Sequence, residues 1–393
     1  MEIFLKGKGS GKKIVMKSRK CAPKKLRFSI FYYFYSSKKN SMQKKDILLL
    51  AGAAAVAAAT GFATHSGLNS VLLFLLAAVA LVLVAMIVGK ATEQLGSRMG
   101  PAATGVLQSA LGNLPELFVC IFALKAGLIT VVKAALIGSI LGNSVLVFGM
   151  AIFFGGIKNG RQYFHSEPPK MNAILMILAF AAMAVPTLTF YLHTPAESHI
   201  NMLDIIVSVV LLIVFGAYLS FSIKGDQSVI PAEDTEAHEA SWSLPVTLIV
   251  LAASGAGAAF VSDWFVEALK PAMDSLGINE VFAGLIVVAI AGNAIENIVG
   301  IQLAIKNKAD YAVSVIMNSS LQIALVLYPL LILISFFLGG AILSFVLSPL
   351  LLAALALSVL VSAFIVFDGE SIWLEGVALI GLYIIIAAAF WWG

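Results

Sequence analysis

Long apolar segments are the feature that most restricts the fold of this chain. Taking about 20 apolar residues for each membrane crossing, we count eleven segments. They lie near 47–64, 69–89, 101–124, 128–154, 171–191, 203–223, 244–262, 281–304, 309–335, 341–366 and 372–392. The composition agrees, since 60% of the residues are hydrophobic and only 12% are charged. The sequence therefore predicts an all-α, polytopic membrane protein with eleven transmembrane helices.

Positive charge is concentrated at the N-terminus. Residues 1–45 hold 14 Lys or Arg and one acid, whereas the rest of the chain holds 11 basic and 20 acidic residues. We expect a basic tail at 1–43 that is disordered or lies on anionic lipid, or else a misassigned start upstream of Met42. The body has no basic patch, so no nucleic-acid partner is expected. The two cysteines, Cys21 and Cys120, offer no disulfide framework.

The distribution of Lys and Arg between loops predicts the orientation of the chain. With the tail inside, the inner loops hold eight Lys or Arg and the outer side holds three. We therefore expect the N-terminus in the cytoplasm. The short loops favour a prokaryotic cell membrane, with a vacuolar membrane as the alternative.

Two stretches of the chain resemble each other. GNLPELFVCIFALKAGLITVVKAALIGSIL (112–141) aligns without a gap to GNAIENIVGIQLAIKNKADYAVSVIMNSSL (292–321), at an offset of 180, with seven identical positions of thirty. The first copy starts in the third crossing and the second in the eighth, so an odd number of crossings separates them. The copies would then face opposite ways across the bilayer, as in the inverted repeats of many secondary transporters.

This repeat divides the chain into five predicted regions. The basic tail (1–43) and an extra transmembrane helix (44–66) come first. Two inverted five-helix repeats follow, 67–223 with crossings 2–6 and 244–393 with crossings 7–11. Between them lies an acidic cytoplasmic linker, 224–243. The linker lacks the spacing of an EF-hand. We expect it to be a solvated loop, with a regulatory cation sensor as the alternative. Its acids are Asp226, Glu233, Asp234, Glu236 and Glu239.

Two carboxylates lie deep in the predicted membrane segments and fall on each other in the repeat. These are Glu116 and Glu296, each about one turn past the midpoint of its segment. Intramembrane acids are costly and usually functional. Two acids at matched positions therefore predict a binding site.

Uncharged polar residues lie near each acid at spacings that share a helix face. Asn113 and Asn293 each lie three residues before an acid. In the crossing that follows each acid, Ser139 and Asn143 are four apart, and Ser319 and Gln322 are three apart. A single Asn or Ser in a membrane helix is most often an interhelical hydrogen bond, but here the residues repeat around the two acids. The candidate supporting ligands or helix-break positions are Asn113, Asn293, Ser139, Ser319, Gln322, Asn143, Gly112 and Gly292. The glycines are expected to allow close backbone approach and to loosen the helix.

The candidate ligands are all oxygen atoms. No His or Cys stands beside them, so Zn²⁺ and Cu²⁺ are poor candidates, whereas hard oxygen ligands suit Ca²⁺. Two carboxylates neutralise one divalent cation or, when it leaves, two protons. A buried carboxylate near a like charge binds a proton more readily, which makes competition between Ca²⁺ and H⁺ plausible at physiological pH.

At these residues the sequence resembles the calcium/cation antiporter superfamily and, within it, the Ca²⁺/H⁺ exchanger (CAX) family. GNLPELFVCIFALKAGLI with GSILGN resembles the first signature region, and GNAIENIVGIQLAIKNKADYAVSVIMNSSLQIAL the second. The resemblance implies that Glu116 and Glu296 bind Ca²⁺ and exchange it for H⁺. The sequence departs from the family's pattern at two positions. Asn297 stands where the family usually has His, and Pro115 is closer to the pattern of the Na⁺/Ca²⁺ exchanger branch.

We therefore predict a secondary antiporter, not an enzyme, that exports cytosolic Ca²⁺ in exchange for H⁺ by alternating access. Ca²⁺ and H⁺ would compete for the two glutamates. A Na⁺/Ca²⁺ exchanger is the closest alternative, and a Ca²⁺ channel is a more distant one, since channels usually place ligands in rings about a symmetry axis. Ca²⁺ is expected as transported substrate with no cofactor, the lipid bilayer as surroundings, and a homo-oligomer as a possible assembly.

Overall fold

The computed structural model describes residues 42–99, 107, 110–224 and 241–392. These residues belong to one unit, Met42–Gly393. Nearly all of the predicted basic tail, residues 225–240 of the predicted linker, and most of 100–109 lie outside the described residues. The five linker acids named above are among them.

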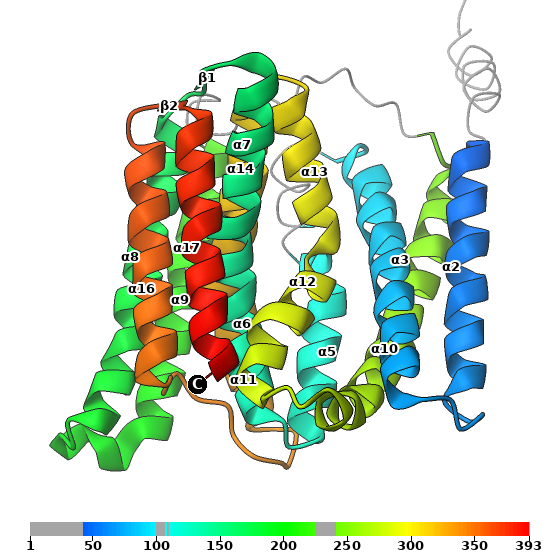
Figure 1. Cartoon of the computed structure of the whole chain (residues 1–393), viewed down its shortest axis with the longest axis horizontal. Coiled ribbons are helices and arrows are strands. Elements are labelled where there is room, and N and C mark those ends of the chain that lie inside the picture. The colour runs from blue at the N-terminus through cyan, green and yellow to red at the C-terminus, as the bar shows by residue number, and fades with distance from the viewer. Residues whose placement is uncertain (1–41, 100–106, 108–109, 225–240, 393) are drawn as a thin grey trace, which may run out of the picture. The chain divides into compact units, whose positions relative to one another are not determined.

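The described elements are helices, apart from two short strands (Figure 1). Before the linker they are α2 (Lys44–Ala63), α3 (Ser70–Gly96), α5 (Leu114–Lys125), α6 (Ile129–Leu141), the π-helix η1 (Gly142–Val147), α7 (Phe148–Asn159), β1 (Gln162–Tyr163), α8 (Glu167–Tyr191), the 3₁₀-helix η2 (Pro195–His199) and α9 (Ile200–Lys224). After it they are α10 (Leu244–Leu276), α11 (Glu280–Phe282), the π-helix η3 (Ala283–Val288), α12 (Ala289–Gly292), α13 (Ala294–Ile305), α14 (Ala309–Gln322), the π-helix η4 (Ile323–Leu327), α15 (Tyr328–Ser335), α16 (Pro349–Val366), β2 (Glu370–Ser371) and α17 (Trp373–Trp392).

Among the described residues, nine helical stretches are long and apolar enough to cross a membrane. A bent pair, Glu280–Gly292 with Asn297–Ile305, adds a tenth if it is one span broken by 62°. The predicted segment 101–124 is described mainly from Leu114 onward, as α5. The structure therefore shows a multi-pass helical membrane protein. The total of eleven transmembrane helices stays a prediction.

Two predicted segments differ clearly from the observed helices. The segment predicted at 244–262 is the start of α10, which continues to Leu276. The segment predicted at 341–366 is helical only from Pro349, where Ser348 caps the helix by accepting from Leu351 N. The apolar stretch before it, 341–348, is non-helical, and Leu343, Phe345 and Leu347 within it are buried.

Side chains from four helices hold this stretch in place. Lys133 on α6 donates to Val346 O at 2.7 Å, and Tyr328 on α15 donates to Ser344 O at 3.0 Å. Asp204 on α9 accepts from Phe345 N at 3.2 Å, and Thr187 on α8 donates to Phe345 O at 2.7 Å. Because protein side chains satisfy these backbone polar groups, the stretch can lie beside spanning helices without being helical.

Element boundaries recur at the same offset as the two similar stretches of sequence. Helices α5 and α13 begin and end at matched positions. The first residues of α6 and α14 also match, and so do the last residues of α3 and α10. The turns after α5 and α13 each contain a residue with positive φ, Gly127 at 78° and Asn307 at 61°. Gly and Asn are the residues that tolerate this conformation. The two stretches therefore share local structure as well as sequence.

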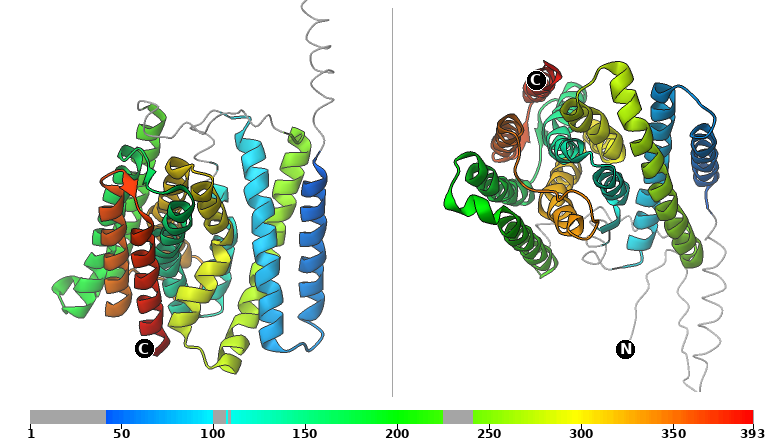
Figure 2. Two further views of the ribbon diagram at one scale, coloured as in Figure 1. Left: turned by 45° about the horizontal axis from the view of Figure 1, so that its top comes forward. Right: turned by 90° about the horizontal axis from the view of Figure 1, so that it is seen from below.

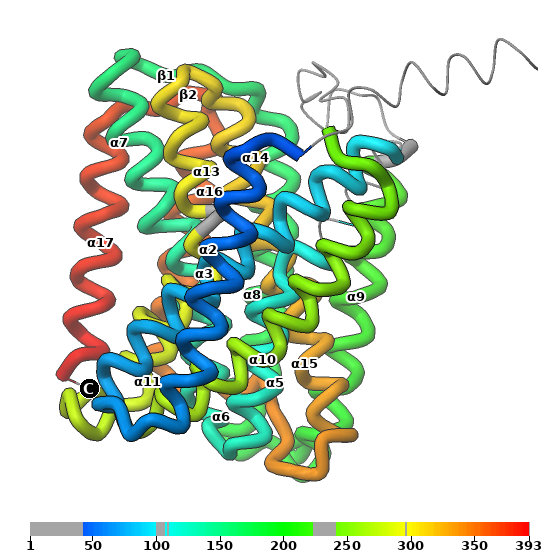
Figure 3. The backbone as a smooth tube through the Cα atoms, turned by 90° about the vertical axis from the view of Figure 1, so that its right-hand side faces the viewer, coloured from blue at the N-terminus to red at the C-terminus, as the bar shows by residue number. Residues whose placement is uncertain are grey.

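The paired helices α5 and α13 lie toward opposite ends of the bundle in two views at right angles (Figures 1 and 3). We call the end that holds Lys125, Lys133 and Asp274 the outer end, as the loop charges predict. The other end, with Lys90 and Arg161, is the inner end.

Helices α2, α3 and α10 pack side by side at one edge of the bundle (Figure 2). The Phe74 and Phe265 rings join α3 to α10, with centroids 4.8 Å apart. At the inner end Lys90 pairs with the buried Asp46, whose second oxygen accepts from Trp242 Nε1 at 2.9 Å. These contacts attach the extra N-terminal helix to both α3 and the start of α10.

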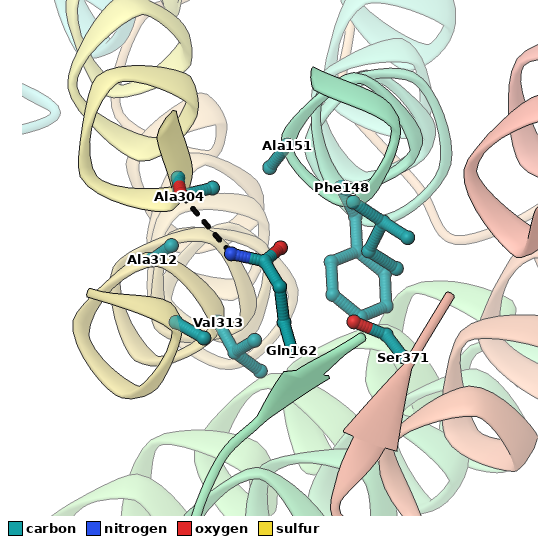
Figure 4. A pocket seen from close by; sticks show the side chains of 9 residues that line it. Phe148, Ala151, Gln162, Ala304, Ala312, Val313 and Ser371 are labelled. Carbon is teal, nitrogen blue, oxygen red and sulfur yellow. Dashed lines mark hydrogen bonds between the residues drawn. The ribbon is translucent and has the colours of Figure 1, made fainter. Parts of the chain in front are cut away.

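The strands β1 and β2 pair antiparallel at the inner end, with Gln162 opposite Ser371. Gln162 points into a small space among α7, α13 and α14 and donates to Ala304 O at 3.0 Å (Figure 4). The cavity left there is about 10 Å³, about the smallest space that can hold one water molecule. This part of the inner end is closely filled.

Candidate ion-binding site

Glu116 lies in the first turn of α5 and is 5% exposed. Pro115 occupies a first-turn position, where its missing N–H costs no helical hydrogen bond, and Asn113 is the N-cap residue. The helix therefore begins directly at the candidate carboxylate. The partial positive charge of a helix N-terminus favours an ionised acid at this position.

Two side chains from other elements converge on Glu116. Ser139 on α6 donates a hydrogen bond to Glu116 Oε1. Asn293, between α12 and α13, places its Nδ2 3.4 Å from the same oxygen and 2.8 Å from Ser139 Oγ. The same amide nitrogen lies 3.1 Å from Ala289 O. Ser139 and Asn293 are 1% and 2% exposed, so the cluster is closed to solvent.

The close crossing of α6 with η3 brings this cluster together. A Cβ at Gly138 would lie 2.1 Å from Leu285 O, and one at Gly284 would lie 2.4 Å from Val131 O. Only glycine therefore fits at these two contacts. Gly292 faces Glu116 directly, since a Cβ there would be 3.7 Å from Glu116 Cγ. Residues from both stretches of the sequence repeat meet at one carboxylate.

A second polar contact joins the helices that follow. Asn143, in η1, donates from Nδ2 to Ser319 Oγ on α14 at 2.9 Å. Both side chains are buried, as is Gln322 at the end of α14. The π-helices η1 and η4 begin beside these residues. Such π-bulges widen a helix locally and are frequent at functional sites.

The structure thus brings Glu116, Ser139, Asn293 and Gly292 together, and joins Asn143 to Ser319. Glu296 lies in α13, but its side chain is outside the described residues. Gly112 lies in the turn before α5. The ion-binding role of every one of these residues stays a prediction.

Sequence reasoning missed one neighbour of the cluster. Ser262 on α10 is fully buried, and its Oγ lies 3.4 Å from Pro115 O. Its signal in the sequence is a polar Ser-Asp pair within the apolar run AAFVSDWF. Without the structure, nothing indicates that this face of α10 meets α5.

The arrangement offers a carboxylate oxygen and a hydroxyl oxygen to a ligand, and the Asn293 amide faces both through its nitrogen, which is a donor. Among the described residues, no group of three or more His, Cys, Asp or Glu side chains is placed to hold a metal ion. A hydroxyl can donate to an ionised carboxylate and can also accept from a protonated one. Ser139 is therefore able to serve Glu116 in either protonation state.

The chain matches a family model over most of its length. Residues 69–224 and 246–392 match the family described as sodium/calcium exchanger protein. The chain belongs to this family. The two matched ranges lie on either side of the linker, and the resemblance read from the two motifs is confirmed.

Members of the family with similar sequences include two antiporters. The chain is 36% identical over 339 residues to a Ca²⁺/H⁺ antiporter of Aphanothece halophytica, covering 82% of this chain and 90% of that protein. It is 37% identical over 352 residues to a Ca²⁺/H⁺ antiporter of Synechocystis sp., covering 84% and 93%. Among solved structures, native YfkE superposes with a TM-score of 0.73 at 33% identity, covering 88% of this chain and all of that chain.

Proposed function

We propose that this family member is a secondary antiporter that exports cytosolic Ca²⁺ in exchange for H⁺. The observation that carries the proposal is the burial of Glu116 among polar hydrogen-bond partners from both halves of the chain. The names of its relatives support the same ion pair, since both antiporters described above carry Ca²⁺ and H⁺ in their names.

Glu116 and Glu296 bind Ca²⁺ and protons in turn. Two carboxylates balance one Ca²⁺, and two protons balance them when it leaves. A site that changes sides with bare carboxylates would carry uncompensated charge through the bilayer, which is costly. The requirement that one ligand always be bound therefore couples the two fluxes.

Two inverted repeats, with crossings 2–6 and 7–11, would build this site at their interface. The shared boundaries of α5 with α13 and the placement of these two helices toward opposite ends support this architecture. The bent pair and the predicted segment 101–124, which contains α5, would supply the remaining two of the eleven predicted crossings. Helix α2 stands outside the repeats, with the N-terminus in the cytoplasm of a prokaryotic cell.

Substitution of the glutamates tests the proposal. Everted membrane vesicles with an acidic lumen should accumulate Ca²⁺ through the unaltered chain and lose this uptake in Glu116→Gln and in Glu296→Gln. Glu167→Gln is the matched control, since Glu167 is an exposed acid at the start of α8. Retained uptake in both single glutamate variants of the site would refute the proposed mechanism.

A further inference from the structure

Asp204, near the start of α9, is a buried acid that the proposed exchange does not use. It belongs to a helix face on which buried residues follow at spacings of three or four: Asp204, Ser208, Leu211 and Phe215. Asp204 and Ser208 are both 0% exposed. The acid therefore faces protein and not lipid, and its burial is costly unless its charge and its oxygen atoms are satisfied.

Asp204 and Lys133 hold the same three residues of the non-helical stretch before α16. From α9, Asp204 accepts from Phe345 N at 3.2 Å. From α6, Lys133 Nζ donates to Ser344 Oγ at 2.8 Å and to Val346 O at 2.7 Å. The opposite charges of the two side chains also attract each other. An acid and a base from the first half of the chain thus grip one short segment of the second half.

Two polar atoms on this face of α9 have no hydrogen-bond partner among the described residues. They are Asp204 Oδ2 and Ser208 Oγ. Because Ser208 follows Asp204 by about one helical turn, the two side chains lie on the same side of α9. Buried polar atoms are almost always hydrogen-bonded, and ordered water serves those that protein atoms do not reach. Two neighbouring atoms of this kind indicate one bound water molecule between them.

The neighbours of Asp204 favour its ionised form. The titratable groups that interact with it are Lys133 on α6 and Tyr328 on α15, and the Tyr328 hydroxyl already donates to Ser344 O at 3.0 Å. An ionised Asp204 balances the charge of Lys133. A protonated Asp204 would leave a partly buried ammonium group without its counter-charge, which is unfavourable.

We propose that Asp204 and Lys133 form a buried charge pair, completed by a water molecule bound to Asp204 Oδ2 and Ser208 Oγ, and that this pair positions α6 for ion binding. Lys133 precedes Ser139 by six residues, or about 9 Å along the helix. The charge pair fixes one end of α6 against the second half, and the contact of Gly138 with Leu285 fixes the other. The positioning role rests on the proposed function, whereas the charge pair does not.

Neutral substitutions test the charge pair without reference to transport. Asp204→Asn keeps an oxygen atom for Phe345 N and removes the charge, so it should lower the unfolding temperature in detergent by about 4 °C. In a Lys133→Met background the same substitution should raise the unfolding temperature, because it removes an unbalanced buried charge. An Asp204→Asn variant as stable as the unaltered chain, or equal losses in both backgrounds, would overturn the charge pair.

The matched control is the ion pair of Arg161 with Glu370 at the inner end, where both side chains are partly exposed to solvent. Glu370→Gln should change the unfolding temperature by less than about 1 °C, with or without Arg161→Gln, because exposed ion pairs contribute little. A change of sign between these two backgrounds as well would show that the effect at Asp204 is not a consequence of burial.

The bound water has its own test. A structure of the unaltered chain at a resolution that shows ordered water should contain one molecule within hydrogen-bond distance of both Asp204 Oδ2 and Ser208 Oγ. Ser208→Ala removes one of its two partners and should lose it. Direct contact between the two side chains, with no water, would overturn the water site.

The pH dependence of Ca²⁺ uptake tests the positioning role. Ser139 donates to Glu116, so its displacement favours the protonated carboxyl group and should move the pH dependence toward alkaline pH. Lys133→Met should produce a shift of about half a pH unit in this direction, and added Asp204→Asn should reverse part of it. In a Ser139→Ala background, Lys133→Met should cause no further shift. Lower stability with an unchanged pH dependence would refute the positioning role.

The two proposals fail separately. If Glu116→Gln abolishes exchange while Lys133→Met leaves the pH dependence unchanged, the ion site stands and the positioning role is wrong. If Glu116→Gln retains exchange, the proposed function is wrong, and the unfolding temperatures still decide whether Asp204 and Lys133 are paired.

Discussion

Asn293, at the start of α13, holds its side-chain nitrogen 2.8 Å from Ser139 Oγ on α6, although the two residues are 154 positions apart. Ser139 in turn donates to Glu116. One amide from the second half of the chain thus orients a hydroxyl and a carboxylate from the first half. A substitution in either half of the chain should therefore change the hydrogen bonding of Glu116.

Removal of the Asn293 amide should weaken Ca²⁺ binding. Asn293→Ala leaves two buried oxygen atoms without this donor, at a cost of about 1–3 kcal/mol. We expect the Ca²⁺ concentration for half-maximal uptake to rise by about tenfold or more, since about 1.4 kcal/mol corresponds to a factor of ten. Asn159→Ala is the control, because its amide donates to Ala304 O at the inner end. Equal effects of the two substitutions would contradict a specific role.

Ser139→Ala should shift the pH dependence of Ca²⁺ uptake toward alkaline pH. The hydroxyl donates to the ionised carboxylate, so its loss favours the protonated form. More alkaline solution is then needed before Ca²⁺ displaces the proton. The measurement is Ca²⁺ uptake against cytoplasmic-side pH at fixed Ca²⁺. A shift toward acid pH would show that Ser139 stabilises the protonated form instead.

Gly138→Ala should disturb the crossing of α6 with η3. The added Cβ would lie 2.1 Å from Leu285 O, and this neighbour is backbone that must move. Overpacking of this kind costs about 1–3 kcal/mol, and the shift should also lower transport by moving Ser139. Gly142→Ala provides a control four residues further along, where the added Cβ meets nothing within 4 Å. Thermal unfolding in detergent and Ca²⁺ uptake should both separate the two variants.

The contact of Asp46 with Lys90 and Trp242 should stabilise the attachment of α2. Asp46→Asn and Trp242→Phe each remove part of one buried network, at about 1–3 kcal/mol each. Because the two residues share a hydrogen bond, the double variant should lose less than the sum of the single variants. Additive losses would show that the residues act independently.

The sequence identified the paired stretches because helix periodicity and buried acids are local signals. The boundaries of α5 and α13 follow the register of the two similar stretches, and Ser139 is among the supporting residues that the sequence predicts. Which partners meet depends on contacts between distant segments, such as Gly138 against Leu285 and Ser262 against Pro115. No local pattern encodes these contacts.

Apolar composition also misled the prediction in two places. The stretch 341–348 is as apolar as a spanning segment but is non-helical, because Lys133, Asp204 and Thr187 satisfy its backbone. Helix α10 continues past the end of its apolar run at Ser262 to Leu276, and the charged residues of these last turns are exposed. Hydropathy reports how apolar a segment is. It does not distinguish a spanning helix from a buried non-helical stretch, and it does not mark where a helix ends.

The most direct test of the account measures both fluxes under each gradient in turn. Purified protein in liposomes is given an acidic lumen in Na⁺-free solution, and then a Na⁺-loaded lumen with pH clamped on both sides. The account predicts Ca²⁺ uptake with matching proton release in the first case, little uptake in the second, and loss of both fluxes in Glu116→Gln. Ca²⁺ uptake driven by Na⁺ at clamped pH, without proton release, would contradict it.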